Sequence, residues 1–197
     1  MGRPKSRSDE EVVAAAWRAV GRHGPATFTI RQVAAEAGLS PAAIMQRFGS
    51  KARLMAALRA DGADLVRRAF DEATAGHADP RRALVEALAS CASSVARGED
   101  MANHVAFLAM DLADEEGRRQ TRTFFRLLHT NIGTLVARAL DPDDRQQAER
   151  TTDSIEAAYH GALLSAAVYG KTPAEHVRRR VEQACAAHLR PPRPAQG

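Results

Sequence analysis

The chain has 197 residues, of which 45% are hydrophobic and 26% are charged. This composition is typical of a soluble protein with one or two domains, and it argues against bulk disorder. No apolar run approaches the roughly 18 residues of a membrane span, and no apolar stretch follows the basic N-terminus as in a secretory signal. We therefore expect a cytoplasmic protein with no membrane partner.

The two cysteines, Cys91 and Cys185, lie far apart in apolar surroundings and form no CxxC pair. We interpret them as small buried hydrophobic residues rather than as a disulfide or a pair of metal ligands. This interpretation fits a reducing compartment, and the sequence predicts no metal site.

Charge is unevenly distributed, although the formal net charge is only +4. Residues 1–59 hold ten lysines and arginines against four acidic residues, whereas the remainder holds eighteen against twenty. A basic first third suggests an anionic partner at that end of the protein. The alternative is uneven surface charge with no partner, because charge alone does not identify nucleic acid.

Apolar residues recur with a helical period along most of the chain, and no alternating strand pattern is found. Capping residues and glycines mark where the helices begin and end. We therefore predict an all-α fold of about nine helices. In chain order they run over 9–23, 29–37, 41–48, 51–75, 80–97 and 100–113, then from a charged bend at 114–117 to 140, from the segment 141–144 to 169, and from 172–173 to 189.

The third predicted helix is short and closely bounded. Gly38 ends the helix before it, Ser40 is positioned as its N-cap with Pro41 at its first position, and Gly49 ends it. A helix of two turns has too few hydrogen bonds to be stable alone, so other parts of the protein must hold it.

The spacing of residues 29–48 is that of a helix-turn-helix, whose second helix lies in the DNA major groove. Ile44 and Phe48 lie four residues apart and are expected to bury against the neighbouring helices. Gln46 then faces outward, where it can pair with adenine, and Arg47 can reach guanine or a phosphate. The alternative is that this geometry serves only helix packing, as it does in many folds.

Phosphate contacts are expected around the short helix, at the N-terminus of the preceding helix, at Lys51, and from a flexible basic arm at the chain start. The predicted DNA-binding residues are Arg3, Lys5, Arg7, Thr29, Arg31, Gln32, Ser40, Pro41, Ala42, Ala43, Met45, Gln46, Arg47 and Lys51.

The stretch TIRQVAAEAGLSPAAIMQRFGSKARL, residues 29–54, resembles the N-terminal signature of the TetR/AcrR transcriptional regulators. The matching residues are Thr29, Val33, Ala34, Ala37, Gly38, Leu39, Ser40, Ile44, Phe48, Ser50, Lys51 and Leu54. The chain departs from the family pattern at Ala42, Met45, Gln46 and Arg47, where relatives often carry a small glycine-like residue, an aromatic pair and a histidine. These departures leave the base preference open but not the docking mode.

The resemblance implies a helix-turn-helix domain followed by a helical domain that dimerises and often binds a small molecule. We place the basic arm and the DNA-binding domain at residues 1–52, the regulatory domain at 53–190, and a disordered proline-rich tail at 191–197.

The last two predicted helices carry apolar stripes and small residues that suit close helix packing, so we expect two helices from each subunit to form a four-helix interface. The alternative is that these stripes only close the core of a single chain. The candidate interface residues are Tyr159, Ala162, Leu163, Ala166, Val177, Val181, Ala184 and His188.

Helices between residues 84 and 140 carry the side chains that are candidates to line an effector pocket. Met and Phe at helical spacing are more typical of a core than of a pocket, and His104 with Asp111 fits a structural or surface pair equally well. The candidate ligand-binding residues are Cys91, His104, Phe107, Asp111, Phe125 and His129.

No catalytic motif is found, including HExxH, a nucleophile elbow, a Walker loop and GxGxxG, so we predict neither an enzyme nor a cofactor. The leading hypothesis is a homodimeric repressor that binds a near-palindromic double-stranded DNA operator and is released by an unidentified small-molecule effector. The alternative is a helical binding or scaffold protein that has lost DNA binding.

Overall fold

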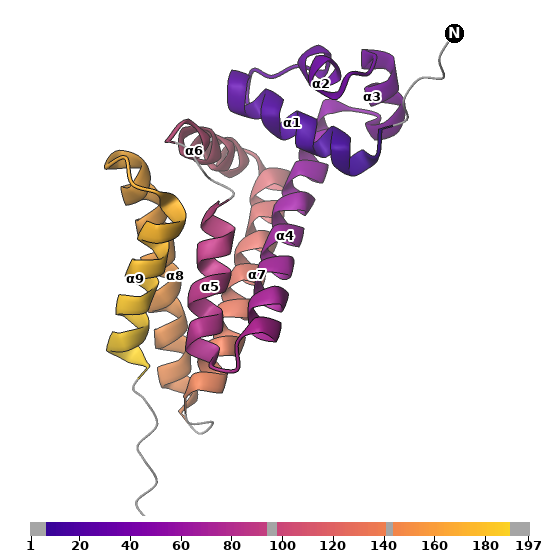
Figure 1. Cartoon of the computed structure of the whole chain (residues 1–197). Helices are drawn as coiled ribbons and strands as arrows, with labels where there is room; N and C mark the ends of the chain where they lie inside the picture. Colours follow the sequence, from indigo (N-terminus) through magenta and orange to yellow (C-terminus); the bar gives the residue numbers. More distant parts are fainter. Residues whose placement is uncertain (1–6, 94–97, 141–143, 190–197) are drawn as a thin grey trace, which may run out of the picture. The chain divides into compact units, whose positions relative to one another are not determined.

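The computed structural model describes residues 7–93, 98–140 and 144–189, and for 98–100 it describes only the backbone. Within these ranges all regular structure is helical and no strand occurs, which confirms the predicted all-α fold (Figure 1). None of the described helices is long and apolar enough to cross a bilayer. The helices are α1 (Asp9–His23), α2 (Ile30–Ala37), α3 (Pro41–Phe48), α4 (Lys51–Gly76), α5 (Pro80–Ser93), α6 (Gly98–Ala113), α7 (Glu115–Ala139), α8 (Arg145–Val168) and α9 (Pro173–His188).

The helices pack into two compact units. Unit 1 comprises Met1–Asp64 and Ala102–Phe124, and unit 2 comprises Leu65–Met101 and Phe125–Gly197. Helices α4, α6 and α7 therefore contribute residues to both units. The boundary predicted after residue 52 separates an expected DNA-binding domain from an expected regulatory domain. It is a different division from that into packed units, and it stays a prediction. The predicted tail at 191–197 lies outside the described residues.

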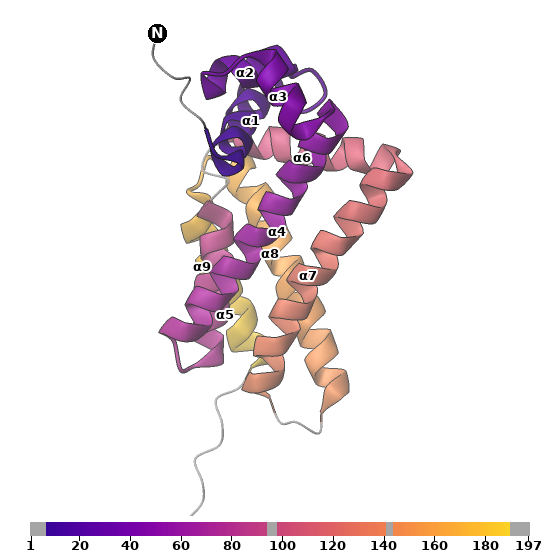
Figure 2. The same cartoon turned by 90° about the vertical axis from the view of Figure 1, so that its right-hand side faces the viewer.

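Unit 1 is built around α1, α2 and α3, which gather into one cluster in both views (Figures 1 and 2). Their apolar faces meet in a shared core that includes the fully buried Val12, Val33 and Ile44. Leu58 of α4 and Phe107 of α6 complete that core. The short helix α3 is therefore held by tertiary packing, as its length requires.

The junction between α6 and α7 differs from the expected charged bend at 114–117. Only Asp114 interrupts the helical backbone, and α7 already begins at Glu115. The Asp114 carboxylate accepts a hydrogen bond from the Gly117 N–H at 2.8 Å, and Glu115 and Glu116 complement the positive end of the helix. The prediction was wrong for residues 115–117, which already belong to α7, where Gly117 packs against the backbone of Asp111.

Unit 2 contains α5, α8 and α9, and α9 packs against both of the others. Helices α8 and α9 run antiparallel to each other (Figure 1). Arg178 of α9 donates from Nε to the Glu86 carboxylate of α5 over 3.2 Å, and this bond lowers the pKa of Glu86. Apolar side chains such as Leu88, Ile155 and Val181 are fully buried.

Candidate nucleic-acid interface

The turn between α2 and α3 is fixed by backbone bonds. Gly38 adopts the left-handed conformation with φ 67°, which a glycine accepts without steric cost. The Leu39 N–H donates to the Ala34 carbonyl over 2.9 Å, which satisfies one free acceptor at the end of α2. This turn sets the direction in which α3 leaves α2.

The N-terminus of α3 is capped as the sequence predicts. The Ser40 hydroxyl accepts a hydrogen bond from the Ala43 N–H at 3.1 Å, and Pro41 occupies the first helical position. At the other end, Gly49 has φ 75° and its N–H donates to the Met45 carbonyl. These two ends delimit a helix of eight residues.

Helix α3 buries one side and exposes the other. Ile44 has no exposed surface, and Phe48 is half-buried against the same core, which confirms the inward face predicted for this helix. The outward face is formed by Pro41, Ala42, Met45, Gln46 and Arg47, which are all exposed. Met45 is the large apolar side chain of this outward face, and it is 42% exposed.

The N-terminus of α2 holds a capping box that the sequence reading did not identify. The Thr29 hydroxyl accepts from the Gln32 N–H, and the Gln32 side-chain oxygen accepts from the Thr29 N–H at 2.7 Å. Two predicted phosphate-binding residues therefore bond to each other in the free protein, and the spacing T-x-x-Q was the signal. Arg31 beside them is exposed.

The cations predicted to contact DNA have different surroundings. The Lys51 ammonium donates to the Ala26 carbonyl at 3.2 Å and lies 4.3 Å from the centre of the Phe28 ring. Arg47 donates from Nη1 to the carbonyl oxygen of Arg7 and approaches the Asp9 carboxylate to 3.5 Å. These contacts hold the two side chains at defined places. The predicted residues Arg3 and Lys5 lie outside the described part of the chain.

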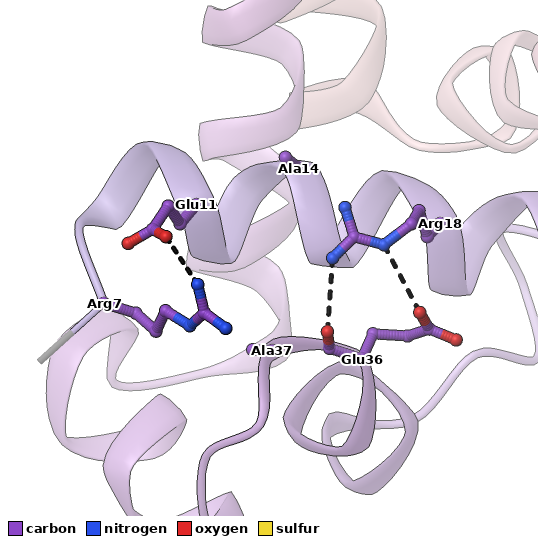
Figure 3. Close-up of a pocket in the computed structure, with 6 residues that line it drawn as sticks. All are labelled: Arg7, Glu11, Ala14, Arg18, Glu36 and Ala37. Atoms are coloured by element: carbon purple, nitrogen blue, oxygen red, sulfur yellow. Dashed lines mark hydrogen bonds and ion pairs between the residues drawn. The ribbon is translucent and has the colours of Figure 1, made fainter. Parts of the chain in front are cut away.

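Arg7 and Glu11 line a surface pocket of about 200 Å³ beside α1, together with Arg18 and Glu36 (Figure 3). The Arg7 guanidinium donates to the Glu11 carboxylate at 2.7 Å, and Arg18 donates to that of Glu36 at 3.3 Å. The Ser8 backbone N–H and Arg7 together lower the pKa of Glu11. The Arg18–Glu36 pair joins α1 to α2, whereas the Arg7–Glu11 pair is local to the start of α1.

The predicted ligand residues fall into both units, and three of them belong to unit 1. His104 is exposed, whereas Phe107 and Asp111 are buried. The Phe107 ring lies 5.9 Å from the ring of Trp17 in the core. The Asp111 carboxylate accepts bonds from Arg59 Nε at 3.0 Å and from the Thr121 hydroxyl at 2.8 Å. In this structure Asp111 is part of an internal ion pair.

The other three predicted ligand residues belong to unit 2. Burial raises the pKa of Cys91 to about 12. The Phe125 ring stacks on His160 with centroids 5.2 Å apart, and His129 Nδ1 lies 2.8 Å from the Glu156 carboxylate.

Glu156 and His160 were missed by the sequence reading, although their i,i+4 spacing on a helix was a usable signal. The His160 Nε2 atom is buried and makes no hydrogen bond. Burial lowers the pKa of His160, which keeps the ring neutral near pH 7.

A larger pocket of unit 2, about 560 Å³, lies between the start of α5 and the end of α9. None of the predicted ligand residues lines this pocket, whose walls include Arg82, Val85, Glu182 and Cys185. The position of an effector site therefore stays a prediction.

The candidate interface residues are largely internal to the single chain. Six of them are buried: Tyr159, Ala162, Leu163, Ala166, Val177 and Val181. Ala184 is half-buried and His188 is exposed. A different face of α8 is solvent-exposed and apolar, and it carries Ala157, Gly161, Leu164 and Val168 at helical spacing. Leu164 is 51% exposed and Val168 is 77% exposed.

The chain resembles known regulators in sequence and in fold. Residues 12–58 match the family of bacterial regulatory proteins named after TetR. The HTH-type transcriptional regulator BetI of Brucella suis biovar 1 is 31% identical over 168 residues, which cover 83% of this chain and 81% of that protein. The BetI regulator of Agrobacterium fabrum is 32% identical over 162 residues, or 81% of this chain and 78% of that protein.

A TetR transcription regulator from Haloarcula marismortui has a similar solved structure, with a TM-score of 0.73 over 92% of this chain and 97% of that chain at 24% identity. That likeness concerns the fold. The relatives resemble this chain in sequence over most of its length, and the family match covers the helix-turn-helix. Together with the capped and outward-facing α3, they show that this chain belongs to the TetR family of bacterial transcriptional regulators.

Proposed function

We propose that the protein is a homodimeric repressor that binds a near-palindromic DNA operator and is released from it by a small-molecule effector. The outward face of α3 is the observation that carries this proposal. Helix α3 is short and capped at both ends, and its outward face carries no aromatic side chain. The backbone of α3 can therefore approach base edges closely. Gln46 is exposed on this face and has the side chain that pairs with adenine in two hydrogen bonds.

The homodimer is supported by the exposed face of α8. Ala157, Gly161, Leu164 and Val168 form an apolar stripe whose small residues let two helices approach closely. A second copy of this face would pack against it around a two-fold axis, as in most homodimers. This stripe replaces the buried residues of α8 in our proposal, because side chains already packed inside one chain are not available to a partner.

Dimerisation sets the form of the operator. Two copies of α3 related by a two-fold axis would enter successive major grooves about 34 Å apart, so the site should be an inverted repeat. An effector that binds more tightly to a dimer with a different spacing would lower the affinity for DNA by shifting the population of conformations. The side chains around Glu156 in unit 2 are the candidates that we favour for contacts with a polar effector.

Selection from random duplex DNA with the purified protein tests the proposal. We expect enrichment of an inverted repeat whose affinity falls steeply as salt concentration rises, because Lys and Arg contacts release counterions. Gln46→Ala should weaken binding to the selected site by about 1–3 kcal/mol, with relaxed preference at one base position. No enrichment would favour the alternative of a helical binding protein that has lost DNA binding.

A further inference from the structure

The outward face of α3 offers few hydrogen-bonding groups to a partner. Among its exposed residues only Gln46 and Arg47 are polar. The Nη1 atom of Arg47 already donates to the carbonyl oxygen of Arg7 and lies 3.5 Å from the Asp9 carboxylate. Arg47 would have to give up these contacts to reach a base. The amide of Gln46 is therefore the polar group of this face that can read a base most directly.

The rest of the outward face is apolar and is formed by Pro41, Ala42 and Met45. Side chains on a helix lean toward the preceding turn, and the residues in that turn before Met45 are the small Pro41 and Ala42. The Met45 side chain is 42% exposed, and its backbone is held because the Gly49 N–H donates to the Met45 carbonyl over 2.8 Å. These three residues form an apolar patch that adjoins Gln46.

The major groove of DNA presents an apolar group that suits such a patch. Each base pair carries hydrogen-bond donors and acceptors there, and an A·T pair also carries the C5-methyl group of thymine. An apolar side chain pressed against a polar base edge leaves that edge without hydrogen bonds, which is unfavourable. Contact with the methyl group instead removes two apolar surfaces from water. The apolar patch should therefore favour thymine over the other bases.

We propose that Met45 is a specificity-determining residue that reads the C5-methyl group of thymine, beside the adenine contact of Gln46. This inference rests on the proposed DNA-binding function and names a base that it recognises. A thioether has no proton to donate, so Met45 cannot bind a phosphate as a hydrogen-bond donor. Adenine and thymine pair with each other, and we therefore expect A·T pairs where these two neighbouring residues meet the operator.

Replacement of thymine by deoxyuridine tests the inference, because it removes the methyl group and keeps every hydrogen-bonding group of the base. Affinity of the full-length protein is measured for the operator that the wild type selects, with one thymine replaced at a time. We expect a position at which the replacement weakens wild-type binding about 3-fold or more, as the burial of one methyl group implies. At that position Met45→Gln and Met45→Ala should bind the two operators within about 1.5-fold of each other, because the contact is gone.

Gln46→Ala is the matched control, since Gln46 adjoins Met45 on the same exposed face. This variant should bind both operators more weakly but keep the wild-type ratio between them. Met45→Leu keeps an apolar side chain of similar volume and should keep that ratio as well. Thermal unfolding of each variant checks that the helices remain folded, which we expect because the Met45 side chain is exposed.

Two results would overturn this inference and leave the proposed function intact. One is a wild-type protein that selects an operator but binds every deoxyuridine-substituted form as tightly as the parent. The other is a methyl effect that Met45→Gln and Met45→Ala retain in full, or that Gln46→Ala loses equally. A wild-type protein that selects no DNA would overturn the proposed function and this inference with it.

Discussion

Gly117 lies in the first turn of α7, next to the backbone of Asp111 in α6, and its missing side chain is what permits that approach. A Cβ atom there would lie 2.8 Å from both the Cα and the carbonyl oxygen of Asp111, which are backbone atoms that cannot turn aside. We expect Gly117→Ala to lower the free energy of unfolding by about 1–3 kcal/mol, as overpacking does. Urea denaturation at neutral pH measures the change.

Gly76 provides the matched control for that substitution. It also lies in a helix, but nothing is within 4 Å of the position that its Cβ would occupy. Gly76→Ala should change the free energy of unfolding by less than about 1 kcal/mol, in the stabilising direction, because alanine has the higher helix propensity. Equal effects of the two substitutions would contradict the close contact at Gly117.

His160 should make the stability of the protein sensitive to mild acid. Burial holds its pKa below the usual value of 6.5, although the Glu156 carboxylate opposes that shift. The unfolded chain therefore binds more protons than the folded protein as pH falls below that value, so stability decreases in that direction. His160→Asn should reduce the loss of stability between about pH 7.5 and pH 5.5.

Chemical denaturation at the two pH values measures this loss, and His23→Asn is the control because His23 is exposed at the end of α1. We expect the control to keep the wild-type pH dependence. A His160 variant that loses as much stability as the wild type would contradict the prediction.

The burial of a side chain could be predicted where helical periodicity decides it. The contacts of a side chain could not be predicted where its partner lies far away in the sequence. Ile44 and Phe48 share a face of α3 because they lie four residues apart, and the structure turns both toward the core, with Ile44 fully and Phe48 partly buried. The partners of Arg47 could not be read from the sequence, since they depend on how α3 packs against α1. Its charge alone suggested DNA, while its geometry also provides an internal anchor.

Ser40 is the N-cap of α3, and its hydroxyl stabilises the first turn of this short helix. Ser40→Ala would leave the Ala43 N–H without its acceptor and should lower the free energy of unfolding by about 0.5–2 kcal/mol. Ser40→Asp supplies another acceptor and should stay within about 0.5 kcal/mol of the wild type. Urea denaturation compares the variants, and equal destabilisation by alanine and aspartate would count against capping.

The helix ends lie close to the capping residues, as the sequence predicts. Which side of a helix is buried in the core could not be predicted from the sequence in the same way. Ser8 and Thr29 cap α1 and α2 as their residue types predict. In α8, alanine, glycine and leucine surround much of the helix, so periodicity alone could not decide which apolar stripe faces the core. The structure buries Leu163 and exposes Leu164, its neighbour in sequence.

The exposed face of α8 carries a prediction for the whole molecule. Leu164→Arg should convert a dimer into a monomer while leaving the helical circular dichroism unchanged, because a charge cannot be buried at an apolar interface without a partner. Leu112→Arg is the matched control, since Leu112 of α6 is 54% exposed against 51% for Leu164. Sedimentation at micromolar concentration measures the mass of each variant.

We expect Leu112→Arg to keep the mass of the wild-type dimer. A wild-type monomer, or a Leu164 variant that remains dimeric, would contradict the assignment of this face. Family membership supports the dimer, but the choice of face depends on the burial of each side chain, which only the folded chain reveals.

The state of the two thiols makes this protein suitable for site-directed spectroscopy. Burial raises the pKa of Cys91 to about 12 and that of Cys185 to about 11, so both remain protonated and slow to react at neutral pH. A cysteine introduced at an exposed position on α3 would ionise more readily and react first with maleimide. A fluorophore placed there could report the approach of α3 to DNA in the otherwise unaltered chain.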